Sequence, residues 1–313
     1  MFREFAVEPE AIVNFETPAY WWNAFLNDSG RFISWDEREW SRKFLLSINA
    51  AQLGQIEQKR LETLGKRIIE RALVPRLISA SPEIGWLRRA ITEHSKAPFD
   101  AILTSEEGEH KDFPILYLSQ IGEVIDVDVL PPYDVRRIWL LRGPSRFPRT
   151  SEGIRAILAV LLRKERKLLF CDPYFDMEDG TKYIRPFRGI FQEMKKAKLD
   201  PRYRVVEIHS TEHNKIAPKV WQQSIQNKME PIIPSGQEVR FVLWKAKTHH
   251  NRYLLGNSTG ITIGEGFAET STQGREFDRA ALMTFKDSEE EMENYDTKNR
   301  PNEILADFNI TGR

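Results

Sequence analysis

The sequence has one cysteine, Cys171, no long run of apolar residues and no excess of charge of either sign. A single cysteine excludes a disulfide framework within the chain and a cysteine-based zinc site, and it agrees with a reducing compartment. No stretch approaches the roughly 18 consecutive apolar residues that a transmembrane helix requires. The start, MFREFAVEPE, carries acidic residues where a signal peptide would be apolar. We therefore expect a cytoplasmic protein with no membrane partner.

The charge balance also limits the range of partners. The chain of 313 residues carries 46 basic and 46 acidic residues, so no global field draws it to nucleic acid. Any surface that binds phosphate must therefore be local. The sequence also lacks an internal repeat, and its length suggests two domains. Proline and glycine punctuate the middle of the chain, and we place the domains at residues 1–147 and 148–313.

The first half predicts a mostly helical α+β domain of unknown role. Residues 1–35 are rich in aromatic residues and irregular in pattern, and apolar residues then recur at helical spacing to about Leu77, with a break near Asn49. A short helix is expected at 84–91. Residues 99–104 and 113–118 predict two strands that flank an acidic loop, as in a hairpin.

Three groups of side chains in this half have both a functional and a structural interpretation. The aromatic cluster could stack nucleic-acid bases, but packing against a core is the better interpretation. The acidic loop could hold a metal or form a nuclease centre, but a charged hairpin tip is better. Two aspartates share one strand face and are expected to face solvent. These groups are Tyr20, Trp21, Trp22 and Phe25; Glu106, Glu107, Glu109, His110 and Lys111; and Asp126 with Asp128.

The second half alternates strand and helix patterns. This alternation predicts an α/β domain with a mixed, mainly parallel sheet flanked by helices. Residues 286–300 are a run of charged and polar residues, which predicts a loop or a disordered connection. The expected helices are 153–162, 184–196 and 218–229, and the expected strands are 168–176, 204–210, 239–243, 253–255, 261–264 and 279–285.

The stretch Val239–Phe267 concentrates polar groups where strands end. His249, His250 and Arg252 lie between two apolar runs, and Gly264 and Gly266 follow the last of them. Ligands of α/β sheets gather at strand ends. Imidazole nitrogen can attack phosphorus near neutral pH, and arginine offers parallel donors to phosphoryl oxygens. Backbone donors around the two glycines could approach the same phosphate.

This pattern resembles the phospholipase D superfamily, whose motif is His-x-Lys-x4-Asp-x6-Gly-Ser-x2-Asn. Here it is His250-x-Arg252-x4-Asn257-x6-Gly264-Glu265-x2-Ala268. Members of the superfamily often carry an earlier strand that ends in Asp-Pro-Tyr, which stands here as Asp172-Pro173-Tyr174. The resemblance covers about residues 150–285. Within the superfamily, this segment is most similar to bacterial variants that belong to phage-defence or DNA-processing loci.

The resemblance implies a phospholipase D-like domain with metal-independent phosphodiesterase or nuclease activity and no cofactor. His250 is the implied nucleophile, with Arg252 and Asn257 also catalytic, and Gly264, Glu265, His249 and His209 are the implied substrate-binding residues. Single-motif members pair two subunits, so a homodimer is expected. The expected substrate is a nucleic acid. The alternative is an inactive module that binds nucleic acid or a partner protein within a larger defence or DNA-processing complex.

Three of the departures from the family motif weaken the catalytic interpretation. Asn257 replaces Asp, Arg252 replaces Lys and Glu265 replaces Ser, so the carboxylate that would stabilise an imidazolium is missing. Four acidic residues could replace it, namely Glu265, Glu269, Glu276 and Asp278. His249 has a second interpretation as a mere neighbour of His250. His209, at the end of its strand, could instead be buried or cap the strand.

Overall fold

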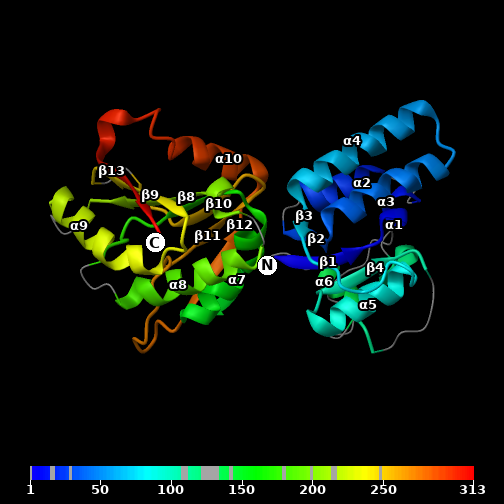
Figure 1. The fold of residues 1–313 in the computed structure, drawn as a ribbon, viewed down its shortest axis with the longest axis horizontal. Helices are drawn as coiled ribbons and strands as arrows, with labels where there is room; N and C mark the ends of the chain where they lie inside the picture. The colour runs from blue at the N-terminus through cyan, green and yellow to red at the C-terminus, as the bar shows by residue number, and fades with distance from the viewer. Residues whose placement is uncertain are drawn as a thin grey trace. The chain divides into compact units, whose positions relative to one another are not determined.

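The computed structural model describes residues 2–14, 18–27, 30–106, 112–120, 134–140, 144–177, 181–197, 200–212, 217–246 and 249–313. The chain divides into two compact units, one of Phe2–Arg142 and the other of Met1 with Gly143–Arg313. Each unit is built around its own β-sheet, with helices on both faces of the sheet (Figure 1). The expected division at residues 147 and 148 lies a few residues further along the chain.

The first unit contains a five-stranded sheet in the order β3-β2-β1-β4-β5. All neighbouring pairs are parallel. Parallel strands that alternate with helices make this unit α/β, so the expectation of an α+β unit is wrong. The strands are β1 Arg3–Val7, β2 Arg31–Trp35, β3 Leu73–Pro75, β4 Ala101–Thr104 and β5 Ile115–Tyr117. The helices are α1 Pro9–Val13, α2 Pro18–Trp22, α3 Glu37–Ala50, α4 Gln55–Arg71, α5 Trp86–Lys96 and α6 Val135–Leu140.

The first unit contains some of the predicted elements and lacks others. The two long helices are confirmed as α3 and α4, and the Asp36 carboxylate caps α3 by accepting the Glu39 N–H. The hairpin is wrong, because Ile102 of β4 pairs with Ile115 of β5 in parallel register. Residues 1–35 are not irregular, since they hold β1 and β2. The apolar run of β1 is only Phe5-Ala6-Val7 between charged neighbours, too short to give a strand pattern.

The groups with two interpretations in this unit are resolved in part. Trp21 and Phe25 are buried, and both rings pack edge-on against Trp139 of α6, so they belong to the core. Of the acidic loop, the members from Glu107 to Lys111 lie outside the described residues. Asp126 and Asp128 also lie outside them.

The second unit contains an eight-stranded sheet in the order β13-β9-β8-β7-β10-β11-β12-β6. Its strands are β6 Ser145–Pro148, β7 Lys167–Cys171, β8 Val205–Thr211, β9 Glu238–Trp244, β10 Tyr253–Gly256, β11 Gly260–Ile263, β12 Phe277–Leu282 and β13 Ile304–Thr311. Its helices are α7 Ser151–Lys164, α8 Thr181–Lys195, α9 Pro218–Met229 and α10 Phe285–Asn294. The strand and helix order that the sequence predicts from residue 150 to 285 is therefore present.

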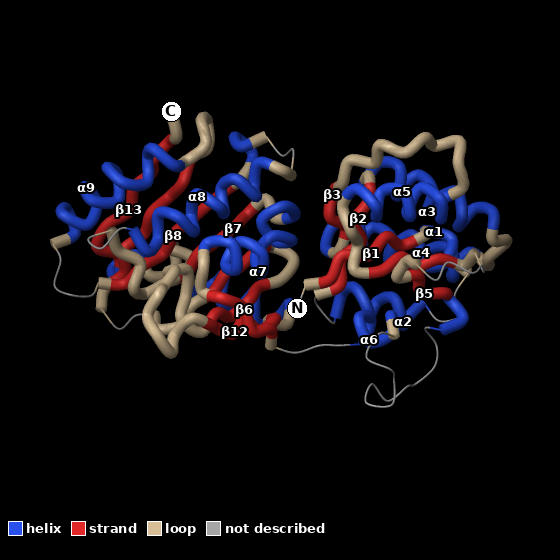
Figure 2. Tube along the Cα trace, turned by 90° about the horizontal axis from the view of Figure 1, so that it is seen from below, coloured by secondary structure: helices blue, strands red, loops and turns tan. Residues whose placement is uncertain are grey.

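This sheet is mixed, as predicted, but it is not mainly parallel. Among the described strands, β7, β8 and β9 run parallel, and the remaining neighbours are antiparallel. Figure 2 shows β6 beside β12, at the end of the sheet. In Figure 1, α7, α8 and α9 lie on one face of the sheet and α10 on the other. In the described part of the chain, no helix is long and apolar enough to cross a membrane.

The predicted loop at 286–300 is wrong for the first part of this charged run, which belongs to the helix α10, whereas residues 295–300 form turns. The hydroxyl of Thr284 caps α10 by accepting the Asp287 N–H. Ser288 is buried, and Met292 and the following Tyr295 pack on the sheet beside Leu169, Cys171 and Trp244. The composition of this run favours a disordered segment because acidic residues cover the exposed side of α10. Only a narrow stripe of the helix packs against the sheet.

Candidate functional site

The register of β10 with β7 brings the centre of the motif beside the Asp-Pro-Tyr segment. Tyr253 lies opposite Cys171 in this antiparallel pair, so Arg252 and Asp172 meet where β10 begins and β7 ends. Arg252 Nε lies 3.8 Å from Asp172 Oδ1. The pairing of β10 with β11 places Ile263 on the other side, where its N–H donates to the Arg252 carbonyl. Segments about 80 residues apart in sequence thus converge on Arg252.

The Arg252 side chain is held in a fixed position. Its Nη1 donates a hydrogen bond of 2.6 Å to the Gly264 carbonyl. Its guanidinium carbon lies 4.9 Å from the ring centre of Tyr174, within the range of a cation–π contact. The side chain stays about one quarter exposed. Part of the guanidinium therefore reaches the surface, where an anion can approach it.

Asp172 anchors the loop that follows β11. The Tyr174 and Phe267 N–H groups donate to its carboxylate at 3.0 and 3.2 Å, and the Tyr183 hydroxyl donates at 3.3 Å. Burial raises the pKa of Asp172, while the two N–H groups and Arg252 oppose that rise. An almost fully buried carboxylate with several donors and a nearby cation is a stable way to hold a turn.

Gly266 is required by this anchor. Its φ of +82° is a conformation that side chains disfavour, and an added Cβ would lie 2.3 Å from Asp172 Oδ2. A Cβ on Gly264 would lie 2.5 Å from Asp278 Oδ1. The Asp278 carboxylate also accepts the Glu265 N–H at 2.7 Å. The backbone donors of Glu265 and Phe267 are therefore taken by Asp278 and Asp172. The Gly264 N–H donates to the Arg279 carbonyl, so these three N–H groups do not face a phosphate.

Glu265 lies at the surface of this loop beside a buried arginine that sequence reasoning missed. Arg149 Nη1 lies 3.5 Å from Glu265 Oε2, and its Nη2 donates to the Ala268 carbonyl at 3.4 Å. Arg149 Nε has no hydrogen-bond partner among the described residues, although the side chain is buried. Two guanidinium groups, Arg149 and Arg252, thus flank the loop. Arg149 follows the prolines of the expected domain boundary, and nothing in its local pattern signals this role.

The two adjacent histidines have different surroundings. His250 is exposed and stands two residues before Arg252. His249 is buried, with its ring stacked on Tyr295 at 4.0 Å between ring centres and edge-on to Trp244. Burial, followed by the charge of Arg300, lowers the pKa of His249 to about 4. His249 is therefore a core residue beneath α10, and the structure does not bring it to the surface with His250.

His209 is also a buried residue of the α10 face. Its Nδ1 accepts the Trp244 indole N–H at 3.1 Å, so the ring proton lies on Nε2, which is 3.2 Å from Glu207 Oε2. Burial lowers the pKa of His209, although Glu207 opposes this. His209 pairs with Cys171 in the sheet. Asp172 follows Cys171 in sequence, and its side chain lies on the opposite face, where it accepts a hydrogen bond from Tyr183 of α8. His209 is thus separated from the Arg252 site by the sheet.

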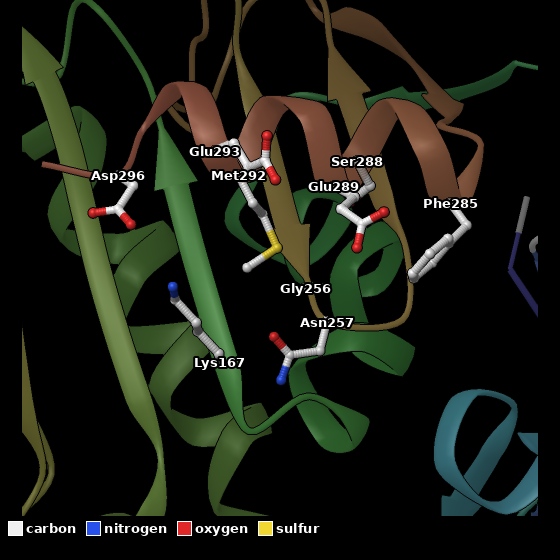
Figure 3. A pocket seen from close by; sticks show the side chains of 9 residues that line it. All are labelled: Lys167, Gly256, Asn257, Phe285, Ser288, Glu289, Met292, Glu293 and Asp296. Atoms are coloured by element: carbon white, nitrogen blue, oxygen red, sulfur yellow. The ribbon is translucent and has the colours of Figure 1, made fainter. Parts of the chain in front are cut away.

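Asn257 lies at the opposite end of β10 from Arg252. A strand of four residues spans about 13 Å. Figure 3 shows Asn257 with Lys167 at a cavity of about 270 Å³ beneath α10. Its backbone N–H bonds to Glu165, whose pKa is raised by burial. The structure does not bring Asn257 together with His250. Within the described residues, no three or more His, Cys, Asp or Glu side chains are placed to hold a metal ion.

Comparisons with known proteins do not assign a family. No protein-family profile matches the chain, and no curated protein has a matching sequence. Among solved structures, one match is to TrmBL2, an archaeal chromatin protein whose structure is described as showing a novel mode of DNA binding. It covers 53% of this chain and 55% of that chain, with 9% identity and a TM-score of 0.29. A TM-score of this size does not establish a common fold.

Proposed function

We propose that the second unit is a phospholipase D-like domain that binds and hydrolyses a phosphodiester of nucleic acid beside Arg252. The observation that carries this proposal is the convergence of Asp172 and Tyr174, Arg252 and Gly264 at one place. These are the separate segments of the resemblance, and they meet although they are far apart in sequence. An exposed imidazole, His250, stands two residues from the arginine that they hold.

The roles follow from the chemistry of the groups. A His250 nitrogen attacks phosphorus, a phosphorus–nitrogen bond forms, and the bond from phosphorus to the leaving oxygen breaks. Water then attacks the phosphohistidine and releases the imidazole. Arg252 balances the charge on the phosphoryl oxygens, and Tyr174 keeps its guanidinium in place. The leaving oxygen needs a proton, which the His250 of a second copy would supply across a two-fold axis.

His250→Ala is the first test. Purified protein should cleave DNA, RNA or a generic phosphodiester in EDTA, and we expect the variant to lose at least about 100-fold in rate, in line with removal of a nucleophile or acid. The thermal unfolding midpoint should not change, because His250 is exposed. Cleavage is measured on labelled substrates under single-turnover conditions.

Asn257→Ala is the matched control for His250→Ala. The family motif makes this position catalytic, but the structure places it one strand length away, so we expect its rate to stay within about threefold of the wild type. Full activity of His250→Ala would reject the nucleophile. A large loss in Asn257→Ala would instead favour the motif over the geometry.

A second candidate function is binding without hydrolysis, in an inactive module that binds nucleic acid or a partner protein in a defence or DNA-processing complex. The buried state of His249 and His209 favours it. Burial lowers the pKa of both imidazoles, which favours their neutral forms, and neither lies with His250. In the described part of the second unit, no further imidazole can protonate a leaving group beside Arg252. A single copy therefore has a phosphate-facing cation and a nucleophile, but not a complete pair of histidines.

Arg252→Ala separates the two functions. If the site holds a phosphate of nucleic acid, the variant should bind more weakly, and the slope of log affinity against log salt should fall by about one unit. Arg146→Ala, an exposed arginine that lies over Phe277, is the control. An unchanged slope together with unchanged cleavage would show that Arg252 does not face the ligand. An unchanged slope combined with lost cleavage would restrict Arg252 to the transition state.

A further inference from the structure

A cavity lined by three arginines lies between α7 and α8, and Arg252 is not part of its lining. Its volume is about 350 Å³, and its lining includes Arg155, Arg185 and Arg188. Arg155 is on α7, and the other two are one turn apart on α8, so the helix pair presents all three to one space. Gly189 of α8 also lines this space.

These arginines are poorly neutralised by the protein. Among the described residues, Arg155 and Arg188 have neither an ion pair nor a hydrogen bond from the guanidinium. Arg185 approaches Glu269 at 3.7 Å, but that carboxylate also accepts the Ser151 hydroxyl at 2.9 Å. The lining holds three arginines against two glutamates. Clustered arginines repel one another, and an anion in the cavity would relieve that repulsion.

We propose that this cavity binds a phosphate monoester group. Guanidinium forks match phosphate oxygens in pairs, and a monoester carries close to two negative charges at neutral pH, which suits several arginines better than one carboxylate does. Ser151, the first residue of α7, lines the same cavity, so the positive end of that helix adds to the attraction. A volume of this size is at the small end of pockets for small molecules.

The cavity adjoins the Arg252 site through one loop. Glu269 is five residues after Gly264, so their Cα atoms are at most about 18 Å apart. Phe267, between them, is fixed by its bond to Asp172, and the Glu269 N–H donates to the Lys182 carbonyl. The phosphate has two sources with the same chemistry, the phosphorylated end of a nucleic-acid strand or a free nucleotide. Neither depends on catalysis by His250.

The test is a binding measurement that makes no use of cleavage. Titration calorimetry with inorganic phosphate and adenosine monophosphate should show binding to the wild type. Fluorescence anisotropy then compares one short oligonucleotide with a 5′-phosphate and with a 5′-hydroxyl. Arg155→Ala combined with Arg188→Ala should weaken phosphate binding at least tenfold, whereas Arg275→Ala, an exposed arginine outside the lining, should not.

The outcomes either identify the ligand of the cavity or overturn the proposal. Preference for the 5′-phosphorylated strand, lost in the double variant, identifies a strand end as the ligand. Binding of the monophosphate without that preference identifies a free nucleotide. Absence of binding at millimolar phosphate and monophosphate, or equal binding by the double variant, overturns the proposal. If the double variant unfolds, Arg188→Gln alone carries the same test, because Arg188 is exposed. His250→Ala should bind phosphate like the wild type. A failure of the proposed hydrolysis can therefore be distinguished from a failure of phosphate binding in this cavity.

Discussion

At the scale of single residues, the site is organised by carboxylates that the family motif does not contain. Asp172 and Asp278 accept the backbone N–H groups of the Gly-Glu-Gly-Phe loop, and Asp172 also approaches Arg252. The sequence singles out His250 and Arg252 as candidates because their spacing is local. It could not identify the role of Asp278 or Arg149, because their partners are set by strand pairing across the sheet.

The buried histidines make stability sensitive to acid. The folded pKa of His249 is about 4, below its ordinary value of about 6.5, so the unfolded chain binds a proton more readily between these values. Stability from this group is present above pH 6.5 and is lost as pH falls toward 4, on the order of 2 kcal/mol. The lowered pKa of His209 acts in the same direction.

Urea unfolding at pH 7 and pH 5 measures this effect. The free energy of unfolding should fall more in the wild type than in His249→Asn, which cannot gain a proton. The adjacent exposed His250→Asn is the control and should keep the full acid sensitivity of the wild type. An equal pH dependence in all three proteins would contradict burial of a neutral imidazole at position 249.

At the scale of elements, sequence periodicity was reliable where amphipathic patterns were long. α9 spans Pro218–Met229 as predicted, and α7 and α8 are shifted by only a few residues. The pattern failed for β1, whose buried run is three residues, and for α10, whose buried stripe is masked by acidic residues. Sequence periodicity also cannot predict strand order, because the placement of β10 beside β7 depends on contacts between distant segments.

The cap of α7 is a testable element of the second unit. The Thr150 hydroxyl accepts the Gly153 N–H at 3.1 Å, which satisfies one free donor of the first turn. Thr150→Ala should therefore lower the free energy of unfolding of this unit by about 1 kcal/mol. Thr150→Ser keeps the acceptor and should recover most of the loss. Urea unfolding followed by circular dichroism gives both values, and an equal loss in the two variants would argue against the cap.

At the scale of the whole molecule, the proposed hydrolysis requires two copies. Among the described residues of the second unit, His250 is the exposed histidine, and the sequence has no internal repeat, so the proposal takes the second imidazole from another subunit. We expect sedimentation equilibrium at micromolar concentration to give twice the chain mass. Mixing His250→Ala with wild-type subunits should reduce activity more than dilution does. A monomer that cleaves would contradict the shared site, whereas an inactive monomer would favour the binding module.

β6 also determines whether the second unit aggregates when it is produced without the first. Its four residues cover the outer side of β12, where Arg146 lies over the exposed ring of Phe277. A fragment that begins at residue 148 would leave the backbone donors and acceptors of β12 bare beside an apolar ring, and such an edge recruits strands from other molecules. It should aggregate or exchange strands. A fragment that begins at residue 144 keeps its own cover and should stay dispersed.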